Sequence, residues 1–142
     1  MPNPVPTLPD DQLIQHLLQL PESYQFDCKR ITGKVDKLLE TVIAFANSDG
    51  GMIAVGLEDP EKAAGPERVF GLDENMLNWD ELLRKLKSRI TEAEQLPITT
   101  NLIACTLRDG SHGVVGILRI GKSSRIHSIV DNGTYVRLQK GN

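Results

Sequence analysis

The segment from residue 34 to residue 57 constrains the fold most, because its apolar pattern changes period in the middle. Up to residue 46 the apolar residues recur with helical spacing and share one face of a predicted helix: Val35, Leu38, Leu39, Val42, Ile43 and Ala46. A turn rich in Asn, Asp and Gly follows at 47–51, and a continuous apolar run follows at 52–57. Such a run is typical of a buried strand. The segment therefore predicts a helix packed against a sheet.

The rest of the chain adds short helices and strands to this unit. Apolar spacing predicts helices at 10–20 and from residue 78 or 80 to about 90, and strands at 24–29, 98–106, 114–120, 125–130 and 134–138. Asp109-Gly110 and Asn132-Gly133 are typical hairpin turns. This order predicts an α+β domain with a mixed β-sheet and helices packed on one side. Residues 1–20 are predicted to be a lead-in with a short helix, and residues 21–142 the domain itself.

Composition excludes several classes of protein. The chain has 142 residues, of which 39% are hydrophobic and 25% charged, as in one globular domain. No apolar run approaches the roughly 20 residues of a membrane span, and the N-terminus lacks the pattern of a secretory signal. Cys28 and Cys105 are too few for a zinc site of the CxxC type and agree with a reducing compartment. We therefore expect a cytoplasmic protein that does not bind a membrane.

Residues 116–123, with the sequence GILRIGKS, match the phosphate-loop pattern GxxxxGK[ST] letter for letter. A phosphate loop needs a helix directly after its Ser, so that backbone N–H groups surround the phosphates. The residues that follow predict another strand instead. We interpret the match as a strand followed by a turn, so the sequence predicts neither a nucleotide site nor a helicase motor.

Three carboxylates stand near the ends of predicted strands: Glu22, Asp27 and Asp59. If the strands at 24–29 and 52–57 pair, these side chains converge, with Lys29 beside them. Carboxylate oxygens suit Mg²⁺ or Mn²⁺, and such an ion can activate water at a phosphodiester. Acids at strand ends are more often simply solvated, so both interpretations stay open and no cofactor is certain.

Basic residues cluster in two segments although the net charge is −3. One segment lies near residue 30 and the other extends from residue 108 to the C-terminus. The basic residues predicted to contact phosphates are Lys29, Arg30, Lys34, Lys122, Arg125, Arg137 and Lys140. Ordinary solvated charge is the alternative interpretation.

Four blocks of sequence together resemble the Schlafen AlbA-like domain. They are ESYQFDCK at 22–29, AFANSDGG at 44–51, VGLED at 55–59 and GTYVR at 133–137. They stand in the order of the family and cover about residues 20 to 141; the second block is the most specific. The resemblance implies the N-terminal, nucleic-acid-binding domain of a bacterial transcriptional regulator. Such proteins are often labelled ATP-dependent helicase-related, and an ATP-binding region often follows in a longer parent chain.

The resemblance also implies a catalytic site. Some animal Schlafen proteins cleave RNA through two glutamates of the first block and an aspartate after the buried strand, and the matching residues here are Glu22, Asp27 and Asp59. The second carboxylate is the shorter Asp, and Cys28 replaces the aromatic residue of the family pattern.

Three functions therefore stay open. The first in rank is a module that binds DNA or RNA. The others are a divalent-metal-dependent nuclease that uses the three carboxylates, and a protein-interaction or homodimerisation domain. The chain alone is not expected to be an enzyme.

Two further features have a structural and a functional interpretation. Asn47 and Asp49 in the turn either orient a ligand or end the helix, and the second is favoured because Asn, Asp and Gly are natural turn residues. Gly50 or Gly51 is predicted to adopt a positive φ. His127 is predicted to be a polar residue at a strand edge rather than a ligand.

Overall fold

The computed structural model describes residues 10–23, 25–31, 35–73, 76–131 and 134–137 of the chain. Its helices are α1 (Asp10–Gln19), α2 (Asp36–Ala46) and α3 (Met76–Ser88), with the short 3-10 helices η1 (Gly65–Arg68) and η3 (Ala93–Gln95). Its strands are β1 (Phe26–Lys29), β2 (Gly51–Val55), β3 (Ile98–Thr106), β4 (His112–Ile120), β5 (Ser128–Asp131) and β6 (Thr134–Arg137). None of the helices in these ranges is long and apolar enough to cross a membrane.

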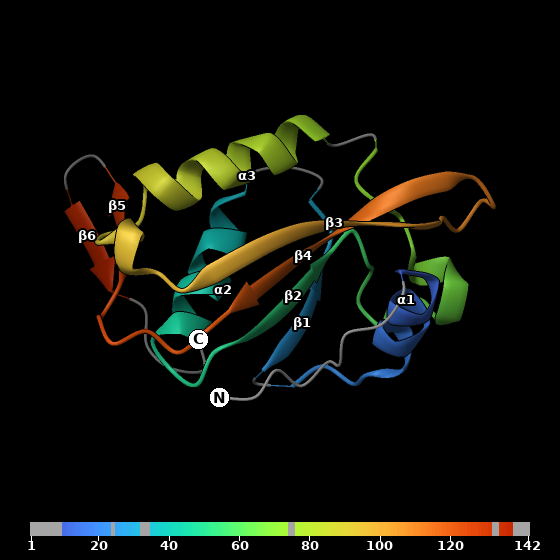
Figure 1. Ribbon diagram of the computed structural model, residues 1–142, viewed down its shortest axis with the longest axis horizontal. Coiled ribbons are helices and arrows are strands. Elements are labelled where there is room, and N and C mark those ends of the chain that lie inside the picture. The colour runs from blue at the N-terminus through green and yellow to red at the C-terminus, as the bar shows by residue number, and fades with distance from the viewer. Residues whose placement is uncertain (1–9, 24, 32–34, 74–75, 132–133, 138–142) are drawn as a thin grey trace.

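Four strands form one mixed sheet in the order β1-β2-β4-β3, and β5 and β6 form a separate hairpin (Figure 1). β1 runs parallel to β2, whereas β4 is antiparallel to both β2 and β3. The predicted α+β fold with a mixed sheet is confirmed. The hairpin turn at Asp109-Gly110 joins β3 to β4 as predicted, whereas the predicted turn at Asn132-Gly133 lies outside the described residues.

Both faces of the sheet are covered, as the alternation along β2 shows. Ile53 and Val55 belong to the core formed with α2 and α3, whereas Met52 and Ala54 belong to a second core formed with α1. The helices predicted for the domain, α2 and α3, lie on one side as expected. The correction concerns α1: its sequence predicted a lead-in helix, but its buried residues cover the opposite face of the sheet.

The turn between α2 and β2 depends on a glycine. Gly50 has a φ of +80°, and a Cβ atom at this position would lie 2.7 Å from the backbone oxygen of Ile120. No other residue type fits both the backbone conformation and the space without a shift. The prediction that Gly50 or Gly51 has a positive φ is confirmed, and Gly50 is the residue that adopts it.

The segment that imitates a phosphate loop is a strand. Residues 116–120 pair with β2 on one side and with β3 on the other, as the last half of β4. The backbone N–H groups of a paired central strand do not form a cradle around phosphate. The structural interpretation of this motif is confirmed.

Candidate nucleic-acid interface

The predicted site residues lie at two different ends of the sheet. We call the end where β1 and β2 finish, beside the β3–β4 hairpin, the carboxyl end; it lies toward the right of Figure 1. We call the end where β2 begins and β4 finishes the amino end. Lys29, Arg30 and Asp59 lie at the carboxyl end, whereas Lys122 and Arg125 follow β4 at the amino end. The predicted basic residues therefore do not form a single cluster.

Of the three remaining predicted basic residues, the structure describes one. Lys34 and Lys140 lie outside the described residues. Arg137 is the last residue of β6, which belongs to the small hairpin rather than to the four-stranded sheet.

The three predicted carboxylates lie close enough to affect one another. The Glu22 carboxylate accepts a hydrogen bond from the backbone N–H of Cys28 at 2.8 Å. The pKa of Glu22 is raised to about 7. Loss of hydration is the largest cause, and a hydrogen bond with Asp27 and the negative charges of Asp27 and Asp59 add to it. Near neutral pH Glu22 therefore binds a proton more readily than an ordinary glutamate does.

These carboxylates do not fit a divalent ion as they are placed. In the described ranges, no group of three or more His, Cys, Asp and Glu side chains is arranged to hold a metal. Asp27 Oδ2 lies 3.2 Å from the ammonium of Lys29. Asp59 Oδ1 accepts a hydrogen bond from the backbone N–H of Glu61 at 2.8 Å. Two of the oxygens that an ion would need are therefore engaged with the protein itself.

A hollow of about 300 Å³ lies beside the carboxylates at the carboxyl end, and we call it the charged hollow. It is lined by Cys28, Lys29, Arg30, Glu58, Asp59 and Lys62. Arg30 Nη1 lies 3.6 Å from Glu58 Oε2, too far for a direct hydrogen bond. Lys62 is exposed and has no ion pair within the described part of the chain. The hollow thus combines three cationic side chains with two carboxylates.

A buried arginine lies under this region, and sequence analysis missed it. Arg68 is 2% exposed. Its guanidinium donates to the backbone oxygens of Glu58 and Leu18, and Nη2 lies 3.2 Å from Cys28 Sγ. Burial raises the pKa of Cys28 to about 12 in spite of this positive neighbour. The thiol therefore stays protonated at neutral pH, and Arg68 links α1, β1 and the segment after β2.

The amino end is different, because its polar groups bond to one another. Asn47 accepts a hydrogen bond from the backbone N–H of His127 at 2.9 Å and donates one to the His127 backbone oxygen at 3.0 Å. The His127 ring lies between the backbone oxygen of Thr91, at 2.8 Å from Nδ1, and Ser123 Oγ, at 2.7 Å from Nε2. A carbonyl oxygen only accepts, so Nδ1 carries the proton and Nε2 accepts from Ser123.

His127 corrects one prediction and Asn47 supports another. His127 is fully buried and precedes β5, so it is not a polar residue at a strand edge. Asn47 ends α2 and ties the segment before β5 to it, which agrees with the structural interpretation of the turn. We call Asn47, Thr91, Ser123 and His127 the histidine knot.

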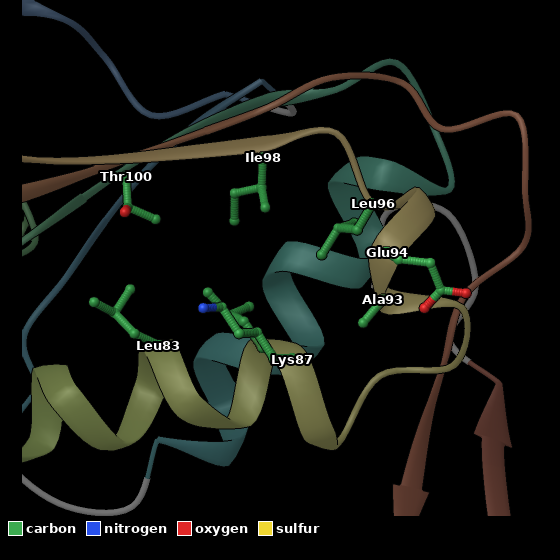
Figure 2. Close-up of a pocket in the computed structure, with 8 residues that line it drawn as sticks. Leu83, Lys87, Ala93, Glu94, Leu96, Ile98 and Thr100 are labelled. Carbon is green, nitrogen blue, oxygen red and sulfur yellow. The ribbon is translucent and has the colours of Figure 1, made fainter.

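A second hollow, of about 500 Å³, lies between α3, η3 and β3 (Figure 2). Leu83 and Lys87 of α3 lie on one side of it, and Leu96 and Ile98 lie on the other. Its lining is mostly apolar, so it is not suited to a phosphate group. The charged hollow is the better candidate for binding an anionic polymer.

Comparisons with known proteins agree with this fold. The sequence model of the family described as "Schlafen, AlbA_2" matches residues 22–142. Sixteen chains of solved structures match. One is the solution structure of the N-terminal domain of a RecG-related protein from Nitrosomonas europaea, named as a candidate ATP-dependent DNA helicase. It has a TM-score of 0.59 and 18% identity, and the match covers 96% of this chain and 91% of that one. No curated protein matches the sequence.

Proposed function

The chain belongs to the Schlafen AlbA_2 family, and on this premise we propose that it is a nucleic-acid-binding domain of a bacterial transcriptional regulator. DNA is the first candidate ligand, because the structurally similar domain comes from a protein named for a DNA helicase; RNA is the second. A cytoplasmic location, a homodimer and a C-terminal ATP-binding region in a longer parent chain are parts of the same proposal. The charged hollow is the proposed contact surface.

The observation that carries this proposal is the gathering of Lys29, Arg30 and Lys62 around one hollow. Lys29 ends β1, Arg30 follows it directly, and Lys62 lies in the segment after β2; the parallel pairing of β1 and β2 brings these segments together. Phosphate groups bind such clusters by displacing condensed counterions, so affinity depends strongly on salt. The contacts are made to the backbone of the nucleic acid and carry no base information.

The carboxylates beside the hollow do not prevent this binding. Lost hydration raises the pKa of Glu22 to about 7, so this side chain is less negative near neutral pH than an ordinary glutamate. Asp27 lies 3.2 Å from Lys29, and the two charges of this pair partly offset each other. An approaching phosphate therefore meets less repulsion than the number of acids suggests.

Titration of labelled single-stranded DNA, duplex DNA and RNA at two salt concentrations tests the proposal. We expect Kd values of about 10⁻⁴ to 10⁻⁶ M near physiological salt, with tighter binding at low salt. The double variant Lys29→Ala/Arg30→Ala removes two charges from the carboxyl end and should weaken binding to all three ligands. Lys122→Ala/Arg125→Ala removes two charges from the amino end, and it should weaken binding less if the charged hollow is the main contact surface. Absence of binding to every ligand at low salt would disprove the proposal.

The nuclease alternative has weaker support than binding, because the carboxylates as placed do not fit an ion. The same preparation tests it by incubation of RNA and DNA with Mn²⁺ or Mg²⁺. We expect little or no cleavage. Efficient cleavage that disappears in Asp59→Ala would reverse the order of the two functions.

A further inference from the structure

Three side chains from distant parts of the sequence stack at the carboxyl end of the sheet. The guanidinium carbon of Arg30 lies 3.7 Å from the centroid of the Phe70 ring, and that of Arg108 lies 4.3 Å from the same centroid. Two planar groups of this size at these distances would overlap on one face of the ring, so they cover opposite faces. We call this arrangement the guanidinium stack.

The stack rests on a rigid part of the backbone. The N–H groups of Phe70 and Gly71 both donate to the backbone oxygen of Gly56, at 3.0 and 2.9 Å. Gly56 has a φ of +108°, and a Cβ there would lie 3.1 Å from the carbonyl carbon of Gly71. The backbone N–H of Arg108 donates to the backbone oxygen of Val69 at 2.8 Å. The backbone that carries Phe70 and Arg108 is therefore held in place by hydrogen bonds and by close packing at Gly56.

Both guanidinium groups keep donors available for a ligand. Arg108 Nη2 donates to Glu67 at 2.9 Å, and Arg30 lies 3.6 Å from Glu58 without a direct hydrogen bond. A guanidinium has five N–H donors, of which one carboxylate uses at most two. Stacking uses the flat faces of a guanidinium, so its in-plane N–H donors can still bond to other partners. The Arg30 and Arg108 side chains are 34% and 42% exposed, so water and ligands reach these edges.

We propose that Arg30, Phe70 and Arg108 form a clamp for the phosphate groups of a nucleic-acid backbone. This inference rests on the proposed function and extends its surface from the charged hollow across Phe70 to the β3–β4 hairpin. Guanidinium forks match phosphate oxygens in a bidentate geometry, and stacking on an aromatic ring reduces the ordering cost of binding. Both faces of Phe70 are covered, so the ring is not a platform for a base. The clamp therefore binds without regard to base sequence.

Four variants separate a clamp from general positive charge. Arg108→Ala removes one fork and should weaken binding about tenfold and lower the salt slope by about 1, equally for different sequences. Arg108→Lys keeps the charge but loses the fork, and Phe70→Leu keeps both arginines but loses the stack; both should weaken binding. Arg84→Ala removes one exposed positive charge from α3 and should leave affinity unchanged. Thermal unfolding of each variant checks that it folds.

Each outcome decides one question. If the wild type binds no nucleic acid, the proposed function fails and the clamp fails with it. If the wild type binds and Arg108→Ala equals Arg84→Ala, the clamp alone is wrong. If Arg108→Ala weakens binding but Arg108→Lys and Phe70→Leu match the wild type, only net charge matters and the clamp is also wrong.

Discussion

The two ends of the sheet use polar residues in opposite ways. At the amino end the His127 ring is fully buried and both of its nitrogen atoms have partners. At the carboxyl end Arg30, Lys62 and Arg108 reach solvent, and the carboxylates beside Arg30 and Arg108 leave some of their donors available. Buried polar groups must bond within the protein, because an unmet bond is costly there. Exposed groups that stay only partly bonded can exchange a protein partner for a ligand.

The blocks of the family pattern have different roles at the two ends of the sheet. The AFANSDGG block at 44–51 supplies Asn47 and Gly50, which build the amino end. The blocks at 22–29 and 55–59 supply Lys29, Glu58 and Asp59, which line the charged hollow. The block at 44–51 thus stabilises the fold, and the blocks at 22–29 and 55–59 supply residues of the charged hollow.

The largest effect should come from adding a single carbon atom at Gly50. Gly50→Ala places a Cβ 2.7 Å from the Ile120 backbone oxygen at a φ of +80°, and it should lower the free energy of unfolding by about 3 kcal/mol or more. Gly110 is the matched control at the carboxyl end, because its φ is +86° but nothing lies within 4 Å of a Cβ there. Gly110→Ala should therefore cost only about 1 kcal/mol.

Denaturant unfolding of both glycine variants measures the difference. Equal stabilities would mean that the backbone conformation alone matters and that the close approach to β4 does not. Because Gly50 is far from the charged hollow, the folded fraction of Gly50→Ala should bind nucleic acid as the wild type does.

A smaller loss is expected when the histidine knot is opened. Asn47→Ala leaves the backbone N–H and oxygen of His127 without their side-chain partners, which should cost about 2 kcal/mol of unfolding free energy. Asn101→Ala, on exposed β3, should stay within about 0.5 kcal/mol of the wild type. Thermal unfolding compares the two. A melting temperature of Asn47→Ala equal to that of Asn101→Ala would show that the knot does not hold β5 in place.

The sequence predicted elements well where one pattern continued over several residues. The helical spacing before Ala46 and the apolar run after it identified α2 and β2 to within two residues at each end. The knot and the guanidinium stack gave no such signal, because their members lie far apart in the chain. Arg30, Phe70 and Arg108 come from three segments that only the completed sheet brings together. Arg68 looked like an ordinary charged residue, since nothing local indicates that backbone oxygens will surround it.

The carboxylate site was predicted only in part. The resemblance placed Glu22, Asp27 and Asp59 in one site, and the raised pKa of Glu22 reflects both neighbours. The position of Lys29 beside the carboxylates was predicted and agrees with its ion pair to Asp27. No sequence pattern showed that the backbone of Glu61 engages Asp59. These competing contacts depend on rotamers and turn geometry, which a sequence motif does not encode.

The smallest expected effect is the dependence of stability on the charge of Glu22. Its pKa is 4.5 as an ordinary glutamate and about 7 in the folded chain, mainly because of lost hydration. Between these values the folded state binds more protons than the unfolded state, so stability falls as the pH rises from about 4.5 to about 7 and then levels off. Because Glu22 is exposed, solvent screening should keep the change below about 1 kcal/mol.

Glu22→Gln removes this dependence while keeping an oxygen for the Cys28 N–H. It should therefore stabilise the protein at pH 8, where wild-type Glu22 is charged beside Asp27 and Asp59, and change little near pH 4.5. Glu94→Gln, on exposed η3, is the control and should have no such pH-dependent effect. Unfolding curves at the two pH values measure the difference. Equal stabilities of Glu22→Gln and Glu94→Gln at pH 8 would mean that Glu22 does not interact with Asp27 and Asp59. The three carboxylates at the carboxyl end would then behave as ordinary solvated surface charges.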